Sequence, residues 1–289
     1  MSAPPLIIIT GATNGIGQAA ALELARQGAH LGIVARNPAK AEATVRRITT
    51  TAPGSTVDVF VGDLALMGDI RRVAAQILDR YRRINILINN AGIQLTKQRT
   101  TTEGLPEMVA VNYLAPWLIT SLLYDRLVES APARVVMTAS EGHRLGWSID
   151  PATILTHATP IGRGGVLRAY GKSKLLDVLF TIELAERLAR TGVTANCCCP
   201  GVVATGLGEP DDRTERFYTA LSRTPLVRRP DQGARVLVRL ATDPAFTGRT
   251  GEFVSSTPLA PILPRIPAVR DVALRKRLWQ ETERLLTTV

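Results

Sequence analysis

Residues 6–17 read LIIITGATNGIG, an apolar run that passes directly into a glycine-rich turn. The run is typical of a buried strand, and the helical periodicity that follows predicts that the turn leads into a helix. Gly11, Gly15 and Gly17 carry no side chain, so the backbone can turn tightly and approach a pyrophosphate at the positive end of that helix. The stretch therefore predicts the first unit of a dinucleotide-binding fold; a plain strand-to-helix turn is the alternative.

The rest of the chain alternates between apolar runs and segments of helical period. The predicted strands cover residues 6–9, 30–35, 56–61, 86–89, 134–139, 193–199 and 252–255. The predicted helices cover residues 16–27, 38–50, 68–83, 104–129, 168–191 and 230–242. This alternation predicts an α/β fold, a doubly wound parallel sheet of about seven strands with helices on both faces. We expect one Rossmann-type domain over residues 1–289, with loops at 142–165 and 258–267.

The bulk composition favours a soluble, folded protein. Hydrophobic residues make up 45% of the 289 residues, and no apolar run approaches the ~18 residues that a bilayer-spanning helix needs. Residues 1–9 lack the basic segment and the cleavage site of a secretion signal. Cys197, Cys198 and Cys199 are consecutive, and neighbouring strand residues point to opposite faces, so they do not suit a metal site. We predict a cytoplasmic protein with buried cysteines and no metal.

The formal net charge of +10 raises the question of an anionic partner. The basic residues are spread along predicted helices in pairs such as Arg46-Arg47, Arg71-Arg72 and Arg82-Arg83. This distribution favours a solvated basic surface and predicts no nucleic-acid partner. Part of the charge is available to an anionic cofactor.

The end of the second predicted strand indicates which dinucleotide the chain binds. Rossmann folds that choose NAD usually carry an acidic residue there, which accepts hydrogen bonds from the adenosine ribose. Here the strand ends VARN at residues 34–37, so a 2′-phosphate would meet Arg36 and no carboxylate. We therefore predict NADP(H) rather than NAD(H), with polar contacts from Asn37 and Asn14. An ordinary surface role is the alternative for Arg36. Asp63-Leu64 is predicted to contact the adenine, or Asp63 caps the next helix.

Four polar residues, Asn112, Ser140, Tyr170 and Lys174, are candidates for a proton-transfer site. Tyrosine has a reference pKa of ~10, so the site must favour the phenolate if Tyr170 is to act as a base near neutral pH. Lys174 lies on the same helical face, and a unit charge at ~4 Å with an effective dielectric of ~20 contributes about 4 kcal/mol, or roughly three pKa units. Taken singly, the residues have structural alternatives. Asn112 could bridge helix backbone, Ser140 could cap a strand end, and Tyr170 could be packing.

The chain resembles the short-chain dehydrogenase/reductase family through motifs that occur in the expected order. These motifs are TGATNGIG at residues 10–17, NNAG at residues 89–92, YGKSK at residues 170–174 and PGVVAT at residues 200–205. With Asn112 and Ser140 between them, the resemblance covers about residues 6–255. Within the family, Arg36 and the stretch 169–181 look most like retinol dehydrogenase-type members and related bacterial oxidoreductases.

The resemblance implies a role for each of these residues. Tyr170 would donate a proton to a carbonyl oxygen during its reduction, and Ser140 would hold the same oxygen in place. Lys174 would also hold the nicotinamide ribose, and Asn112 would support a water that relays protons toward Lys174. The other residues expected at the cofactor are Gly11, Thr13, Asn14, Gly15, Ile16, Gly17, Arg36, Asn37, Asp63, Leu64, Asn90, Ala91, Gly92, Pro200, Gly201, Val202 and Thr205.

These features predict an NADP(H)-dependent oxidoreductase that interconverts an alcohol and its aldehyde or ketone. Segments 141–168 and 206–228 carry apolar residues such as Leu145, Trp147 and Phe217, and they predict substrate loops around an apolar compound such as a retinoid, steroid, lipid or xenobiotic carbonyl. Ordinary loop packing is the alternative. His143 is interpreted as a loop residue, because the Tyr170 and Lys174 pair already supplies the proton.

Two other functions compete with this one. The first is an NADP(H)-binding regulatory protein with little turnover, which the complete set of four polar residues disfavours. The second is a sugar-nucleotide epimerase or dehydratase, which the G-x3-G-x-G spacing and the NNAG motif disfavour.

Residues 258–289 form a C-terminal extension in which 270–286 predict a helix. Its apolar residues share one side, and residues 275–277 form a basic cluster. Packing on the domain or on a second subunit is favoured over peripheral contact with an anionic membrane. The resemblance also implies a homodimer or homotetramer that forms through the helices bearing Asn112 and Tyr170.

Overall fold

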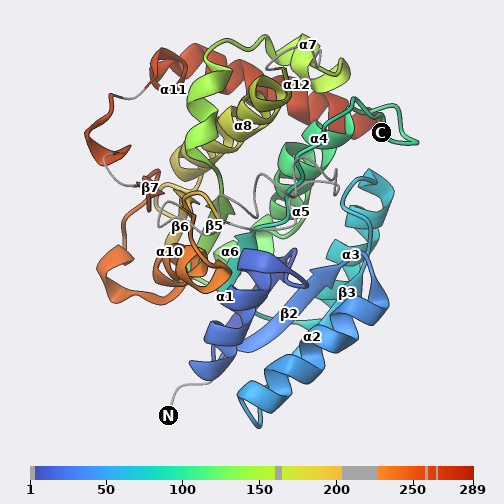
Figure 1. The fold of residues 1–289 in the computed structure, drawn as a ribbon, viewed down its shortest axis with the longest axis vertical. Helices are drawn as coiled ribbons and strands as arrows, with labels where there is room; N and C mark the ends of the chain where they lie inside the picture. The colour runs from blue at the N-terminus through green and yellow to red at the C-terminus, as the bar shows by residue number, and fades with distance from the viewer. Residues whose placement is uncertain (1–3, 160–164, 204–226, 258–259, 265) are drawn as a thin grey trace.

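Seven parallel strands form one sheet in the order β3-β2-β1-β4-β5-β6-β7. The computed structural model describes residues 4–159, 165–203, 227–257, 260–264 and 266–289. The strands are β1 (Leu6–Thr10), β2 (His30–Ala35), β3 (Val57–Val61), β4 (Ile86–Asn89), β5 (Ala133–Thr138), β6 (Val193–Cys199) and β7 (Phe253–Ser255). The chain builds outward from β1 to β3, returns to the other side of β1 with β4, and builds outward again to β7. Figure 1 shows β2 and β3 toward one end of the sheet and β6 and β7 toward the other. The order of the strands therefore reverses between β1 and β4.

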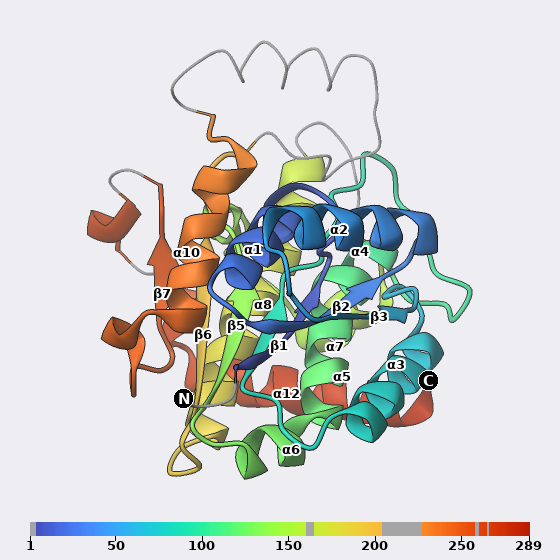
Figure 2. The same cartoon turned by 90° about the horizontal axis from the view of Figure 1, so that it is seen from below.

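Helices cover both faces of this sheet (Figure 2). On one face α1 (Gly15–Arg26), α2 (Pro38–Thr51) and α10 (Pro230–Thr242) bury apolar side chains in one core cluster. On the other face α3 (Met67–Arg80), α5 (Ala115–Leu122) and α8 (Gly165–Arg187) contribute to a second, larger cluster. Because both faces are covered, the central strands are continuous apolar runs, and β1 is buried at every position.

Shorter elements connect these layers. They are α4 (Glu107–Val109), the π-helical turn η1 (Ala110–Leu114), α6 (Tyr124–Glu129), the 3₁₀ helix η2 (Glu141–Gly146), α7 (Pro151–Thr156), η3 (Pro244–Phe246), η4 (Ala260–Ile262), α11 (Pro267–Arg270) and α12 (Val272–Thr288).

The predicted fold class is confirmed, and each of the seven predicted strands is present within one residue of its expected bounds. The single helix predicted over 104–129 is wrong, because that segment divides into α4, η1, α5 and α6. Pro116 lies in the first turn of α5 and has no N–H to continue a regular helix from the preceding turn. Leu123 then leaves helical geometry, with φ −95° and ψ 1°, and separates α5 from α6.

The loops predicted at 142–165 and 258–267 are corrected in their described parts. The first contains most of η2 and all of α7, and the second contains η4 and the first residue of α11. Pro151 and Pro267 each stand in the first turn of a short helix, and the Asp150 side chain caps α7 by accepting from Thr153 N. Proline is favoured at the first helical position as well as in loops, so its presence alone did not distinguish the two.

The C-terminal helix α12 lies against α7 and α8 (Figure 1, in red). Trp279 stacks on Phe180 of α8 with ring centroids 5.9 Å apart, and Tyr113 shares a 2.8 Å hydrogen bond with Thr282. Arg275, from the predicted basic cluster, is buried and pairs with Glu186. The apolar side of α12 is thus packed on the domain. Among the described residues, no helix has the length and hydropathy to cross a membrane.

Candidate active site

The carboxyl ends of β1 and β4 meet where the strand order reverses, which is where open α/β sheets bind their ligands. Asn90, directly after β4, joins the two ends. Its side-chain amide donates to the carbonyl oxygens of Thr10 at 3.1 Å and Gly11 at 3.3 Å. The Thr10 hydroxyl in turn accepts from the backbone N–H groups of Asn90 and Ala91, each at 3.0 Å. These bonds fix the glycine turn against the NNAG segment.

The glycine turn is compatible with a pyrophosphate. A Cβ on Gly17 would lie 2.2 Å from the Gly11 carbonyl oxygen, and Gly11 itself has a φ of +69°, so neither position accepts a side chain without rearrangement. The Asn14 side chain caps α1 by accepting from Gly15 N at 2.8 Å. The N–H groups of the first helical turn, which include that of Ile16, have no partners within a helix. N–H groups at the start of a helix that have no partner within the helix can bind an anionic group.

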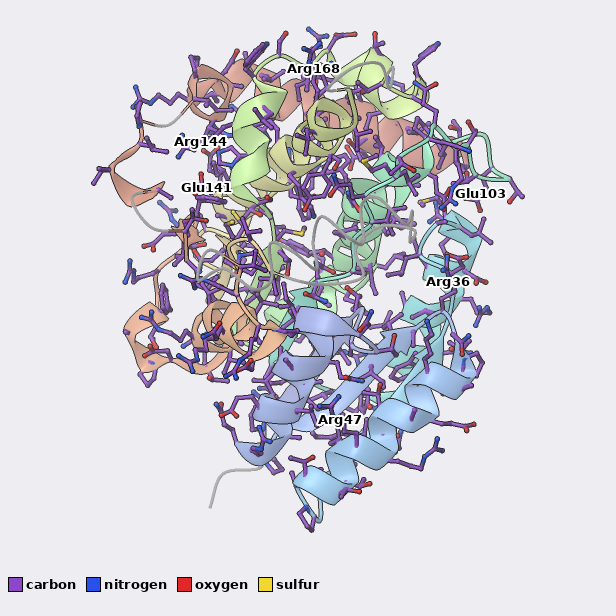
Figure 3. All side chains as sticks on the ribbon, in the orientation of Figure 1. Arg36, Arg47, Glu103, Glu141, Arg144 and Arg168 are labelled. Atoms are coloured by element: carbon purple, nitrogen blue, oxygen red, sulfur yellow. The ribbon has the colours of Figure 1, made fainter. Side chains whose placement is uncertain are left out.

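Arg36 supplies an exposed cation at the end of β2. Its guanidinium is 3.9 Å from Asp63 Oδ2, which places the two predicted adenosine-side residues together. Asn37 caps α2 by accepting from Lys40 N at 3.0 Å. In Figure 3, Arg36 lies near α3 on the opposite side of the site from Glu141 and Arg144. The residues of this edge therefore fit a dinucleotide that carries negative charge.

Asp63 does not cap the next helix. Its carboxylate accepts from Ala65 N at 2.9 Å, ahead of α3, and Leu64 beside it is partly buried against the core. The first turn of α3 is instead capped by Glu103, which accepts from Met67 N at 2.7 Å and Gly68 N at 3.1 Å. The capping residue lies 36 positions away along the chain from Met67, so no local pattern could reveal it.

Ser140 and Tyr170 are brought together by close packing of η2 on α8. A Cβ on Gly171 would lie 2.5 Å from the Gly142 carbonyl oxygen, and a Cβ on Gly146 would lie 2.7 Å from the Gly171 carbonyl oxygen. These glycines let the two backbones approach. The Ser140 hydroxyl accepts from Gly142 N at 3.0 Å and also forms a hydrogen bond that lowers the pKa of Tyr170. Ser140 thus caps η2 and faces Tyr170.

Asn112 is fully buried in the π-helical turn η1. Its side-chain oxygen accepts from Ile93 N at 2.7 Å, and its side-chain nitrogen donates to Ile93 O and Ser173 Oγ, each at 2.9 Å. Asn112 therefore links the segment after the NNAG motif to α8. Gly92 lies between Asn112 and Lys174. A Cβ added to Gly92 would be 3.4 Å from Asn112 Oδ1 and 3.6 Å from Lys174 Nζ.

Lys174 is buried and pairs with a residue that sequence reasoning missed. Its Nζ donates to Asp177 Oδ2 at 2.8 Å and to the Thr138 carbonyl oxygen at 2.9 Å, and it lies 5.9 Å from the centre of the Tyr170 ring. Asp177 is three positions beyond Lys174 on α8, and this spacing was the only signal in the sequence that could have found it.

The pKa of Tyr170 is raised above its ordinary value, whereas the sequence predicted a site that favours the phenolate. Burial has the largest effect on the pKa of Tyr170, because it disfavours the charged phenolate. Lys174 opposes that rise, but the negative charge of Asp177 adds to it. From the protein's own groups alone, Tyr170 therefore retains its proton.

The structure describes the PGVVAT segment only as far as Val203. Pro200 is buried, Gly201 has a φ of +86°, and Val202 is exposed. Arg228 lies beside this segment, where its backbone N–H donates to Val202 O at 2.8 Å and its guanidinium donates to Ser256 O. Thr205 and nearly all of the predicted substrate loop 206–228, which includes Phe217, lie outside the described residues.

His143 and two of the cysteines, Cys197 and Cys198, are buried and packed against other parts of the domain. The His143 ring contacts the Ser140 carbonyl oxygen at 2.7 Å and packs on Phe253, and burial lowers its pKa. Cys197 and Cys198 are buried in different core clusters, as expected for neighbours on one strand. Within the described ranges, no group of residues could hold a metal ion.

Comparisons with known proteins agree on one family. The family described as "short chain dehydrogenase" matches residues 5–152. Retinol dehydrogenase 13 from Homo sapiens is 34% identical over 285 residues, covering 97% of this chain and 84% of the relative. A putative daunorubicin C-13 ketoreductase from Streptomyces sp. (strain C5) is 34% identical over 274 residues, covering 95% and 90%. The crystal structure of levodione reductase has the same fold, with a TM-score of 0.71 and 24% identity over 88% of this chain and 96% of that one.

Proposed function

The chain belongs to the short-chain dehydrogenase family, and from that premise we propose that it is an NADP(H)-dependent oxidoreductase in which Tyr170 transfers the proton between an alcohol and its carbonyl partner. The family and its relatives make the chain an oxidoreductase of alcohols or carbonyls with a nicotinamide cofactor. The proposed role of Tyr170 in proton transfer rests on the grouping of Ser140, Tyr170 and Lys174 at the carboxyl edge of the sheet.

When bound, the nicotinamide supplies or takes up the hydride. The Tyr170 hydroxyl would donate its proton to the carbonyl oxygen during reduction and accept it back during oxidation. Ser140, which faces Tyr170, would hold that same oxygen by a hydrogen bond and so orient the reacting carbon. Asn112 and Lys174 would hold a proton-relaying water and the ribose, the roles that the family resemblance implies.

The proposed preference for NADP(H) depends on Arg36. Its exposed guanidinium stands at the end of β2, where a carboxylate would select NAD(H). Arginine binds phosphate in a bidentate, charge-assisted manner, so the 2′-phosphate has a partner here.

The substrate we propose is an apolar alcohol or carbonyl compound. Leu145 on η2 and Trp147 directly after it, close to Ser140 in sequence, are exposed large hydrophobic side chains, as is Leu167 at the start of α8. Apolar pocket walls with a few polar groups are typical of sites for such compounds. Two relatives are named as retinol dehydrogenase 13 and a putative daunorubicin C-13 ketoreductase, and these names support the proposed substrate class. We also propose a cytoplasmic location.

The test is loss of NADPH absorbance with a panel of apolar aldehydes, ketones, retinoids and steroids. We expect Tyr170→Phe to lower kcat/KM by about 10²- to 10⁴-fold, because the proton donor is removed while the ring remains. Tyr124→Phe is the matched control, since the Tyr124 hydroxyl lies on the surface, 3.5 Å from the Arg187 carbonyl oxygen. Equal turnover in the Tyr170→Phe variant would refute the assigned role. Tight NADPH binding with no turnover of any compound would favour a regulatory protein.

A further inference from the structure

A buried ion pair joins Lys174 to Asp177 on α8. The side chains are 4% and 0% exposed, and the Nζ to Oδ2 distance is 2.8 Å. The second oxygen, Oδ1, has no hydrogen-bond partner among the described residues. Burying a carboxylate with one unpaired oxygen costs folding free energy, and an apolar residue would avoid that cost. An apolar residue at this position would stabilise the fold more than the ion pair does. The pair lies next to Tyr170, which indicates a role in the chemistry of that residue.

The titratable groups around this pair come from three elements. Tyr170 and Lys174 belong to α8 itself, Tyr113 comes from η1, and Cys198 and Cys199 come from β6. The pKa of Cys198 is raised by burial, and burial also raises the pKa of Tyr113, so these two groups stay neutral near pH 7. Lys174 and Asp177 thus have the largest charge effects on Tyr170, and Cys199 adds the smallest one.

We propose that Asp177 is a positioning residue that fixes Lys174 Nζ between its own carboxylate and the Thr138 carbonyl oxygen and offsets the lysine charge, so that Tyr170 stays in the proton-donating form used for carbonyl reduction. The inference rests on the proposed function of Tyr170 and adds the residue that sets its protonation state.

The charges of Asp177 and Lys174 shift the pKa of Tyr170 in opposite directions. A carboxylate near Tyr170 disfavours the phenolate and raises the pKa of Tyr170, whereas the ammonium of Lys174 lowers it. Burial raises the pKa of Asp177 to about 7, and Lys174 limits that rise. As the pH rises through this range, the pair changes from a net positive charge to zero, and the support that Lys174 gives to the phenolate is weakened.

Asp177→Asn tests the proposal, because asparagine has the same shape and still offers an oxygen to Lys174 Nζ. In alcohol oxidation, kcat/KM should rise with pH as Tyr170 loses its proton. We expect the midpoint of that rise to move down by about one pH unit or more in the variant. In the reductive direction, activity should fall off at correspondingly lower pH.

Glu183→Gln is the matched control. Glu183 is also a buried carboxylate on α8, with one oxygen paired to Arg187 at 3.0 Å and the other unpaired among the described atoms. Loss of any buried carboxylate on α8 could alter activity by destabilising the protein. In that case Glu183→Gln would alter the activity as well. We expect its pH profile to match that of the unmodified protein.

A second readout does not depend on turnover. The chain contains five tyrosines, so ¹³Cζ-tyrosine NMR of the cofactor-free protein can follow Tyr170 directly, with Tyr170→Phe to assign its signal. The Tyr170 midpoint should be lower in Asp177→Asn than in the unmodified protein. The inference is overturned if Asp177→Asn and the unmodified protein have the same pH profiles in oxidation and reduction and the same Tyr170 NMR midpoint. The proposed function would still stand in that case. A lower NMR midpoint in Asp177→Asn with an unchanged pH profile of kcat/KM would instead overturn the proposed role of Tyr170.

A measurement on the unmodified protein covers the case in which Asp177→Asn does not fold. The ¹³Cγ signal of Asp177 should titrate well above the ordinary range of aspartate, and the Tyr170 signal should show a small step at the same pH. Absence of that common step would count against the inference.

Discussion

The proposed cofactor preference depends on Arg36, and the proposed protonation state of Tyr170 depends on Asp177. Arg36 is the exposed cation beside the predicted adenosine end, and its neighbour Asp63 lies 3.9 Å away. Asp177 is the buried anion beside Lys174 at the other end. Each acts through one charge, so each can be tested by one substitution.

Arg36→Asp should shift the preference of the enzyme from NADPH toward NADH. The change removes the charge-assisted hydrogen bonds to a 2′-phosphate and adds repulsion, which together should lower the ratio of kcat/KM for NADPH to that for NADH by about 10- to 100-fold. Arg46→Asp is the control, because the Arg46 side chain on α2 is 70% exposed against 71% for Arg36 and the charge change is the same. An unchanged ratio would remove the argument built on Arg36.

Gly17→Ala should weaken both folding and cofactor binding. The added Cβ would lie 2.2 Å from the Gly11 carbonyl oxygen and 2.4 Å from Asn90 Nδ2, so the turn must open. We expect a loss of about 2 kcal/mol in the free energy of unfolding, and at least a tenfold weaker NADPH affinity by fluorescence titration. Gly68→Ala, also in a first helical turn, has Glu103 Oε1 at 3.7 Å as its nearest atom and should leave affinity unchanged. Normal NADPH binding by Gly17→Ala would argue against a pyrophosphate at this turn.

Among the elements, η2 and α8 form the site where they pack together. The helix α12 packs on another side of α8. The glycines of η2 and α8 allow backbone contact, which sets Ser140 against Tyr170. On its other side α8 contacts α12 through Phe180, whose ring stacks on Trp279. The helix that carries the site is therefore held from two directions.

Trp279→Ala should destabilise the protein by about 3 kcal/mol in urea unfolding. Trp279 packs on Trp117 with ring centroids 5.2 Å apart, and the Arg187 guanidinium lies 4.1 Å from the centre of its ring, so truncation leaves a cavity between α5, α8 and α12. Gln280→Ala changes an exposed neighbour and should alter stability by less than about 0.5 kcal/mol. Similar unfolding midpoints for the two variants would show that α12 is not part of the cooperative core.

At the scale of the whole molecule, α12 bears on how subunits could meet. The homodimer or homotetramer expected through the helices bearing Asn112 and Tyr170 stays a prediction. In the described structure α12 covers part of α5 and α8 through Trp279, and this area is not open to a second subunit. A dimer would have to use other surfaces of these helices.

Stability of the whole molecule should fall on the acid side as Asp69 becomes protonated. The Asp63 backbone N–H, which donates to Asp69, and then Arg72 hold the pKa of Asp69 below its ordinary value. A carboxylate with a lowered pKa in the folded state stabilises the protein above its unfolded pKa of ~4, and this contribution is lost as the pH falls through the folded value. Asp69→Asn should therefore lower stability at pH 7 and flatten the acid limb of thermal unfolding curves between about pH 5 and 2. Asp79→Asn, an exposed change on the same helix, is the control, and an equally steep acid limb in Asp69→Asn would contradict the assignment.

The sheet could be predicted from local sequence alone, because a strand buried on both faces is a continuous apolar run. Residues 6–10 and 193–199 carry that signal without help from distant parts of the chain. The glycine turn was also readable, since its spacing along the chain is set by the strand and the helix that it joins. Helix ends were less readable, as the division of 104–129 shows, because a proline within an apolar helix can either break it or begin a new one.

The electrostatics of the site and the contacts between distant segments depend on how the whole chain packs. Glu103 caps α3 across 36 positions, and α12 reaches Tyr113 across 169. Lys174 and Asp177 are close in sequence, but burial is what turns their pairing into control over Tyr170. A charge in water is screened and a charge in a packed interior is not, so the direction of the Tyr170 pKa depends on which atoms exclude water from it. Spacing along the chain specifies neighbours on one helix, whereas solvent exclusion depends on every element packed around them.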